Sequence, residues 1–244
     1  MDRQLRFKKG QIVWCTLDGE NYEQRGTRPC IIAQNDVGNK HSTTTLVVPF
    51  TSRKTKSKLP VHVEIKKEEF KNTKLKDSIA LCEQVRVIDR RRITYVEKCI
   101  LSEETMEKIH KALLISFGFG EEKKDKKVVF IRLKDGVGSE HRSSNPFPAL
   151  VIQNQKGNKY SPTLIVAPFG LCKRKKLPTQ VYVPGDQVCR QFKDSVVMLE
   201  QIRVIDKSRV VQEIEETHLS EQIHKEIEKA ILISFGIELK HAIN

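Results

Sequence analysis

The sequence contains one stretch of about 120 residues twice, and this repeat limits the fold more than any other feature. Residues 83–89 have the sequence EQVRVID, and residues 200–206 have EQIRVID. The pair Gln34-Asn35 also recurs, as Gln153-Asn154, and short motifs between these points recur in the same order. Solenoid repeats are much shorter, roughly 20–50 residues. The chain is therefore expected to hold two whole domains in tandem.

The repeat also predicts where the domains begin and end. A charged run with almost no apolar residues, 121–127, separates the two copies and is typical of a solvated linker. The prediction is a first domain at 1–120, a linker at 121–127 and a second domain at 128–244. Each domain is long enough to bury a core of its own.

Charge and cysteine usage suggest a partner and a compartment. The net charge is +13 with a pI of about 9.5, which favours binding to a polyanion, although solubility alone would also explain it. No apolar run approaches the roughly 20 residues that cross a bilayer, and no apolar segment follows the N-terminus. The six cysteines form no CxxC pair. Reduced thiols and a cytoplasmic location are expected.

The order of predicted elements indicates an α+β fold. Each copy has short apolar or alternating segments, typical of strands, and ends in a segment with helical spacing. Ser102 and Ser220 are the predicted N-caps of these two helices, and Gly118 is a predicted stop. Strands followed by one helix favour a small α+β barrel. In the first copy the strands are expected at 12–17, 30–33, 46–50, 61–65, 78–82 and 85–88.

Five motifs of the first copy occur together in a fixed order, and most of them return in the second copy. In this order and spacing they resemble the MazF/PemK family, the toxins of bacterial type II toxin–antitoxin pairs. The motifs are Glu23-Gln24-x-Gly26-x-Arg28-Pro29, Gln34-Asn35-Asp36-x-Gly38-Asn39, Leu59-Pro60-x-His62-Val63-Glu64-Ile65, Asp77-Ser78 and Glu83-Gln84-Val85-Arg86-Val87-Ile88-Asp89.

The resemblance implies a fold, an activity and partners. It implies two SH3-like small β-barrels, each with a C-terminal helix, arranged as an intramolecular pseudo-dimer that could stay monomeric. The implied activity is sequence-specific, metal-independent cleavage of single-stranded RNA, chiefly mRNA, with no cofactor. The implied partners are that RNA and an antitoxin protein, bound in the same groove between the copies. A linker that holds the copies together favours their pairing.

Two residues match the family's catalytic positions, Arg28 and Thr51. Metal-free cleavage uses the 2′-hydroxyl of RNA as the nucleophile and needs donors for the charge that builds on the phosphate. A guanidinium offers a planar fork of donors suited to phosphate, and a hydroxyl adds one more. Whether Arg28 also transfers a proton is left open.

The second copy differs at these two positions. The motifs align Phe147 with Arg28 and Gly170 with Thr51, and neither replacement can hold a phosphate by charge. A single active site, in the first copy, is therefore predicted. His62 alternates with apolar residues and is expected to be structural, and no cluster has the spacing of metal ligands.

Further residues are candidates for RNA contact, but structural roles are equally open for several of them because the second copy keeps Asn154, Leu177, Pro178 and Gln201. The basic residues are expected to neutralise phosphates. The RNA-binding candidates are Glu23, Gln24, Asn35, Arg53, Lys54, Leu59, Pro60 and Gln84.

Two other functions remain open from the sequence. One is a non-catalytic nucleic-acid-binding or regulatory protein, in which both copies only bind. The other is a toxin of the same fold that acts on gyrase through protein contact. The retention of Arg28 and Thr51 beside intact motifs favours the ribonuclease.

Overall fold

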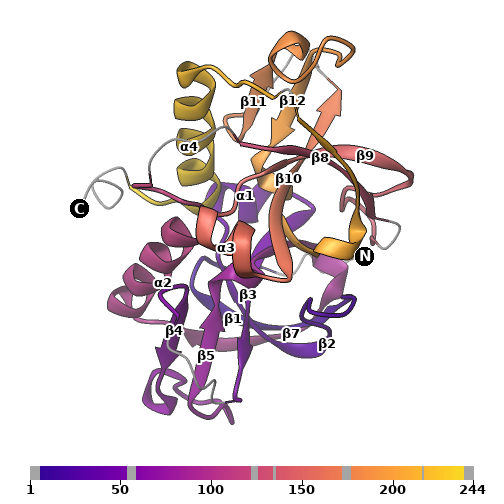
Figure 1. The fold of residues 1–244 in the computed structure, drawn as a ribbon. Coiled ribbons are helices and arrows are strands. Elements are labelled where there is room, and N and C mark those ends of the chain that lie inside the picture. Colours follow the sequence, from indigo (N-terminus) through magenta and orange to yellow (C-terminus); the bar gives the residue numbers. More distant parts are fainter. Residues whose placement is uncertain are drawn as a thin grey trace.

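Strands form most of each copy, and the two copies lie against each other (Figure 1). The computed structural model describes residues 6–53, 59–121, 126–133, 136–171, 177–215 and 217–238. The α+β class predicted from the sequence is confirmed, whereas closure of each sheet into a barrel stays a prediction. The domain boundaries also stay predictions, and residues 122–125 of the expected linker lie outside the described residues.

The first copy contains seven strands and two α-helices within its described residues. The strands are β1 (Gln11–Leu17), β2 (Gly26–Ile32), β3 (Thr44–Thr51), β4 (His62–Ile65), β5 (Ser78–Leu81), β6 (Arg86–Asp89) and β7 (Ile93–Ile100). The helices are α1 (Asp36–His41) and α2 (Glu103–Ser116), and short 3-10 turns occupy 67–69, 82–84 and 90–92.

The second copy repeats this order over its described residues. Its strands are β8 (Val128–Leu133), β9 (Ser143–Val151), β10 (Thr163–Leu171), β11 (Gln180–Val183), β12 (Ser195–Met198), β13 (Arg203–Asp206) and β14 (Val210–Ile214). Its helices are α3 (Gln155–Tyr160) and α4 (Glu221–Phe235), and 3-10 turns occupy 185–187, 199–201 and 207–209.

A single antiparallel sheet runs through both copies. Its order is β14-β8-β9-β10-β13-β6-β3-β2-β1-β7, with the hairpins β4–β5 and β11–β12 joined through β3 and β10. The copies meet at β6 and β13, where Arg86 pairs with Arg203. Two backbone hydrogen bonds reinforce this junction, from Val87 N to Ile202 O at 2.8 Å and from Val204 N to Val85 O at 3.0 Å.

The C-terminal helices of the two copies meet end to end on one side of the sheet (Figure 1). Ser102 and Ser220 accept hydrogen bonds from Thr105 N and Ile223 N, so both predicted N-caps are confirmed. The rings of Phe117 and Phe235 lie 5.3 Å apart, and both side chains are buried in one apolar cluster that includes residues of both copies. The core therefore continues across the junction of the copies.

Most strands predicted from the sequence are confirmed, with shifts of a few residues at their ends. Two elements were missed. Strand β7 is exposed or half-buried along most of its length, so it lacks the apolar pattern that identifies a buried strand. Helix α1 has only six residues, too few for a helical pattern to register.

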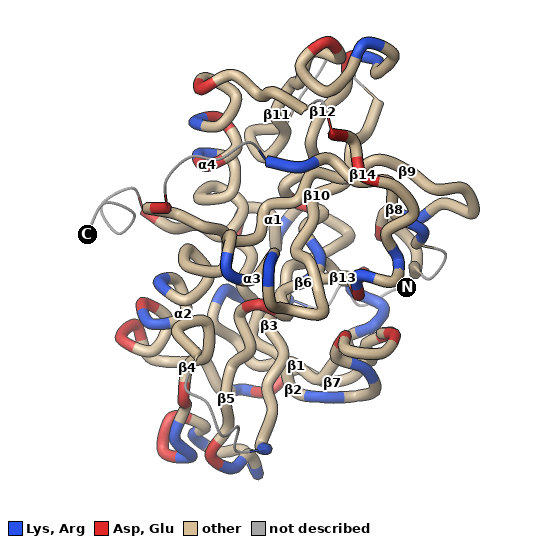
Figure 2. Tube along the Cα trace, viewed as in Figure 1, with Lys and Arg blue, Asp and Glu red and all other residues tan. Residues whose placement is uncertain are grey.

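Basic residues lie on both copies, and on α2 and α4 they are mixed with acidic ones (Figure 2). Among the residues described, no helix has both the length and the apolar character required to cross a membrane.

Candidate active site

Arg28 and Thr51 lie at the ends of neighbouring strands. Strands β2 and β3 pair from Ile32 to Cys30, and the last pair is Cys30 with Pro49. Arg28 lies two residues before Cys30, and Thr51 lies two residues after Pro49. The antiparallel ladder therefore brings the two predicted catalytic residues to the same edge, where β3 leaves β2 and pairs with β5.

The guanidinium of Arg28 is held by the loop that precedes it. Its Nη1 donates to Gln24 Oε1, while Nε donates to the Arg25 carbonyl at 3.1 Å and Nη2 donates to the same oxygen. Burial lowers the pKa of Arg28, and the charges of Arg86 and Arg53 lower it further. Three cationic side chains thus act on one another at this edge, which is a favourable setting for an anion.

Thr51 also has a fixed place. It ends β3, and its Oγ1 accepts a hydrogen bond from Arg53 N at 3.2 Å. Within the described residues the hydroxyl hydrogen of Thr51 has no acceptor, so it can donate, and the side chain is half-buried. Arg53 itself is exposed.

Buried polar residues hold the loop between β1 and β2 in place. Gln84 is buried, and its Oε1 accepts from Gln24 N at 3.2 Å. Arg86, which is 1% exposed, donates through Nη1 to the carbonyls of Asp18 at 2.5 Å and Gln24 at 3.3 Å. The first loop, which joins β1 to β2, is thus hydrogen-bonded to β6 and to the turn before it.

At the same edge of the second copy, the described residues keep Arg203 as the counterpart of Arg86 but have an aromatic residue at the position of Arg28. Phe147 pairs with Ile131 as Arg28 pairs with Cys15, which confirms the alignment. Phe147 is 8% exposed, and the ring of His141 stands edge-on to it at 4.6 Å. Burial, and then the charge of Arg203, lowers the pKa of His141. An aromatic pair therefore replaces the Gln24–Arg28 pair.

The position of Thr51 is also lost in the second copy. Gly170 pairs with Val196 as Thr51 pairs with Ile79. A Cβ added at Gly170 would lie 2.9 Å from Met198 Sδ, so a thioether covers the place of the missing side chain. Arg142, a cation of the loop before Phe147, donates to the Gly136 carbonyl at 2.6 Å, within its own loop.

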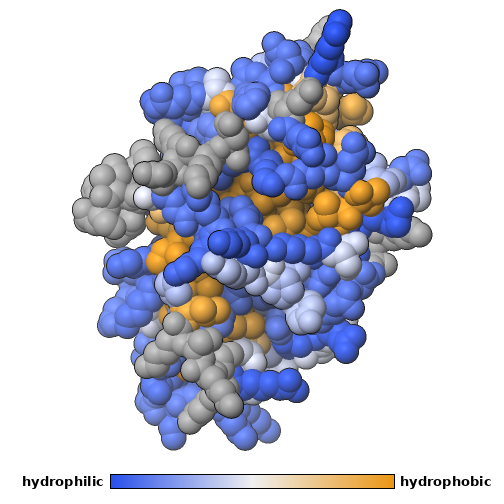
Figure 3. Space-filling view, in the orientation of Figure 1, coloured by the Kyte–Doolittle hydropathy of each residue, from blue (hydrophilic) through white to orange (hydrophobic). Residues whose placement is uncertain are grey.

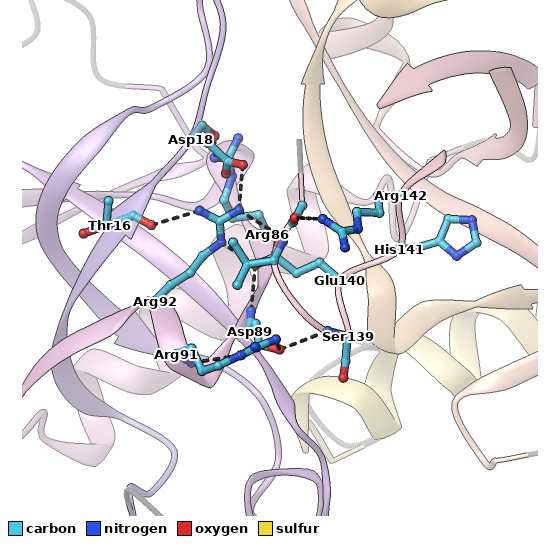
Figure 4. A network of polar contacts seen from close by, with 12 residues as sticks. Thr16, Asp18, Arg86, Asp89, Arg91, Arg92, Ser139, Glu140, His141 and Arg142 are labelled. Carbon is cyan, nitrogen blue, oxygen red and sulfur yellow. Dashed lines mark hydrogen bonds and ion pairs between the residues drawn. The ribbon is translucent and has the colours of Figure 1, made fainter. Parts of the chain in front are cut away.

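Two buried ion pairs connect the copies in a reciprocal way. Arg209 Nε donates to Glu23 Oε1 at 2.7 Å, and Asp206 N donates to the same oxygen at 2.7 Å. In the equivalent pair, Arg92 Nε and Asp89 N both donate to Glu140 Oε1. The distance from Asp89 N to this oxygen is 2.8 Å. Figure 4 shows this second pair, with Ser139 N also directed at Asp89. The β1–β2 loop of the first copy and the β8–β9 loop of the second are therefore each anchored on the opposite copy.

The centre of the junction is not symmetric in its hydrogen bonds. Arg86 Nη2 donates to Glu23 Oε2 at 3.2 Å. Its counterpart Arg203 is buried, and its Nε and Nη1 have no hydrogen-bond partner among the described residues. Burial, with the charge of Arg86 next, lowers the pKa of Arg203 to about 10. Among the described residues, Glu23 is paired with two arginines, Arg86 and Arg209, and Glu140 with one, Arg92.

The structure brings some of the predicted RNA contacts to this edge and buries others. Gln24 and Gln84 lie beside Arg28, whereas Glu23 has a side chain only 1% exposed, with both oxygens bonded to arginines. Leu59 is 45% exposed, and Pro60 is exposed as well. RNA contact by each of them stays a prediction.

Asn35 has a clear structural role. Its Oδ1 accepts from Gly38 N at 2.7 Å and caps α1, and its Nδ2 donates to Ile233 O at 2.8 Å in α4. Asn154 makes the equivalent contact from the second copy, because its Nδ2 donates to Ile115 O in α2 at 2.8 Å. This contact explains why both copies keep the residue. RNA contact by Asn35 stays a prediction, and Lys54 and the basic run 173–176 lie outside the described residues.

The structural role expected for His62 agrees with its contacts. His62 Nε2 lies 3.1 Å from Glu83 Oε1, and Gln180 Nε2 donates to Glu200 Oε1 at 2.6 Å in the second copy. The described part of the chain contains no group of three or more His, Cys, Asp or Glu that could hold a metal ion.

Sequence reasoning missed the partners of Glu23. Glu140 lies eight residues before Pro148 and Glu23 lies six before Pro29, and no contact with the opposite copy was predicted for either carboxylate. The repeated spacing Asp89-x-x-Arg92 and Asp206-x-x-Arg209 was the available signal.

Apolar residues gather on one face of the second copy. Figure 3 shows them over β8, β9 and β10, bordered by hydrophilic residues.

Comparisons with known proteins agree with the repeat. The family model described as PemK-like, MazF-like toxin of type II toxin–antitoxin system matches twice, at residues 8–117 and 124–235. Similar solved structures include MazF (Form-I) from Deinococcus radiodurans, with 19% identity, a TM-score of 0.39, and coverage of 45% of this chain and 94% of that chain. The Mycobacterium tuberculosis toxin MazF-mt6 has 19% identity, a TM-score of 0.37, and coverage of 46% and 98%. An endoribonuclease in complex with its cognate antitoxin from Mycobacterial species has 21% identity, a TM-score of 0.35, and coverage of 44% and 90%.

Proposed function

Because the chain belongs to the family of PemK-like, MazF-like toxins of type II toxin–antitoxin systems, carrying two copies of the family's domain, we propose that it is a toxin endoribonuclease with one active site. Its substrate is single-stranded RNA, chiefly mRNA, in the cytoplasm, cut at a specific sequence without a metal ion. The observation that carries the proposal is the difference between the copies at one sheet edge. In the first copy Arg28 and Thr51 supply charge and hydrogen-bond donors there, whereas Phe147 and Gly170 occupy the equivalent positions in the second.

The chemistry follows from the groups at this edge. The 2′-hydroxyl oxygen of one nucleotide attacks the adjacent phosphorus and gives up its proton. The bond to the 5′-oxygen of the next nucleotide breaks, and that oxygen takes a proton. The products are a 2′,3′-cyclic phosphate and a 5′-hydroxyl end. Arg28 and Thr51 donate hydrogen bonds to the phosphate oxygens as negative charge builds on them.

The positions of Arg28 and Thr51 suit this role. Three donors of Arg28 are engaged by the loop, so the side chain is oriented before substrate arrives, and its remaining donors are available to a phosphate. Preorganised donors in a partly dry site stabilise charge more strongly than mobile ones. Arg53 and Lys54 follow Thr51 along the chain and are proposed to bind RNA phosphates, with Gln24, Leu59, Pro60 and Gln84 as further RNA contacts.

The partners and assembly are part of the same proposal. We propose that an antitoxin protein binds the groove between the copies, and that one chain is a complete pseudo-dimer. The reciprocal pairs of Glu23 with Arg209 and Glu140 with Arg92 support a closed unit, because each copy satisfies the buried charges of the other.

The first test is cleavage of a long single-stranded RNA in EDTA by the wild-type protein and by Arg28→Ala, with the ends mapped. Cuts at one short motif that leave cyclic phosphate and 5′-hydroxyl ends are expected, with a loss of about 10²–10³ in kcat for the variant. Equal cutting by both proteins would reject Arg28 as the catalytic residue. Tight RNA binding without cutting would favour the non-catalytic alternative, and inhibition of gyrase with intact RNA would favour the gyrase-directed one.

A further inference from the structure

The loop that holds Arg28 is itself held by the second copy. Glu23, Gln24 and Arg25 are consecutive residues with different tasks: the first binds the second copy, and the next two bind Arg28. A shift of Glu23 would therefore be passed along one or two peptide units to the acceptors of the Arg28 guanidinium.

The anchor of Glu23 is strong. Arg209 donates to both carboxylate oxygens, at 2.7 and 3.5 Å, and Asp206 N adds a third bond at 2.7 Å. Tyr22 N also donates to Asp206 Oδ2 at 3.3 Å. The segment 206–209 of the second copy thus fixes the loop segment 22–23 of the first, within a buried and poorly screened region.

We infer that Arg209, acting through Glu23, is a positioning residue for the Arg28 site, so that the second copy contributes to the active site of the first. The inference rests on the proposed catalytic function of Arg28. A guanidinium displaced by about 1 Å at a reacting phosphate can lower the rate about 10²-fold, so the orientation of the loop has a direct effect on catalysis.

The chain provides its own control for this inference. Glu140 is anchored on the first copy by Arg92 and Asp89 as Glu23 is anchored on the second, but the residues that follow it lead to His141 and Phe147. Each carboxylate accepts from an arginine Nε and a backbone N of the opposite copy, while Glu23 also accepts from Arg86 of its own copy. Only Glu23 adjoins the residues that hold Arg28.

The experiment compares Glu23→Gln with Glu140→Gln in the full-length protein. Single-turnover and steady-state cleavage of a short fluorogenic RNA give kcat and KM, and thermal melting reports the fold. Both substitutions are expected to lower the melting temperature, but only Glu23→Gln is expected to lower kcat, by about 10²-fold, with KM changed less than about threefold. Equal kcat losses for the two variants, or no loss for Glu23→Gln, would overturn the inference.

A second measurement does not depend on cleavage. The ¹⁵Nε–H signal of Arg28, assigned by its disappearance in Arg28→Lys, reports whether the guanidinium is held by the Arg25 carbonyl. Arg209→Lys keeps the charge and takes the place of Glu23→Gln if that variant does not fold. Faster hydrogen exchange at Arg28 Nε is expected in Arg209→Lys but not in Glu140→Gln, and an unchanged signal would overturn the inference. A wild-type protein that cuts no RNA would reject the proposed function, and this signal would still test the positioning.

Discussion

Arg86 and Arg203 lie directly opposite each other where β6 pairs with β13, so two buried cations meet at the junction of the copies. Arg86 donates to Glu23 and to two backbone carbonyls, whereas two nitrogens of Arg203 lack a partner within the described residues. Among the described residues Arg86 leaves only its Nε without a partner, so the two equivalent positions are expected to differ in their effect on stability.

We predict that Arg203→Met stabilises the protein and that Arg86→Met destabilises it. Replacing a buried, poorly paired charge by an apolar residue of similar volume is worth about 1–4 kcal/mol, while breaking a well-paired one costs about 3–5 kcal/mol. Urea unfolding monitored by circular dichroism gives both changes. A loss of stability in Arg203→Met as large as that in Arg86→Met would contradict the asymmetry.

The aromatic pair of the second copy predicts a dependence of stability on pH. The pKa of His141 is lowered by burial and by Arg203, so the unfolded chain binds a proton at a higher pH than the folded one. Stability from this residue is complete above about pH 6.5 and is lost as the pH falls toward the folded-state pKa, with a slope of at most about 1.4 kcal/mol per pH unit.

His141→Gln, which introduces the residue type of the first copy, should remove this loss. The measurement is the difference in unfolding free energy between variant and wild type from pH 7.5 to 5. A difference that does not change with pH would show that His141 titrates equally in both states.

Asn35 and Asn154 are predicted to contribute equally to stability. Each caps a short helix and donates to the C-terminal helix of the other copy. Replacing either one by alanine should cost about 0.5–2 kcal/mol, the usual range for a lost N-cap. RNA affinity measured on the same two variants decides the remaining role of Asn35, because a loss confined to Asn35→Ala would indicate RNA contact in addition to the structural role.

Arg53 is predicted to bind a phosphate of the RNA. For single-stranded nucleic acid, each neutralised phosphate contributes about −0.7 to the slope of log K against log salt. Arg53→Ala should reduce the magnitude of the slope by about that amount, measured by fluorescence anisotropy with an uncleavable 2′-deoxy substrate. Lys229→Ala, which removes an exposed cation of α4, serves as the control and should leave the slope unchanged.

The sequence predicted the repeat, most strands, both long helices and the divergence at Arg28 and Thr51, because these depend on local patterns that each copy displays. It did not predict the partners of Glu23, which was assigned to RNA together with Gln24. The contacts of Glu23 with the second copy join residues more than 180 positions apart, which no local pattern in the sequence reports. The retention of Asn154 in the second copy left a structural role open for Asn35, and the contacts with α4 and α2 now show that role.

The continuous sheet through β6 and β13 makes the pairing of the two copies independent of protein concentration. In an assembly of separate subunits, dilution shifts the equilibrium toward the parts, and unfolding depends on concentration. Here the partner strand is always supplied by the same molecule, so its local concentration does not fall when the protein becomes scarce. A single molecule of this chain already contains both sides of the junction, with its two unlike copies in a fixed order.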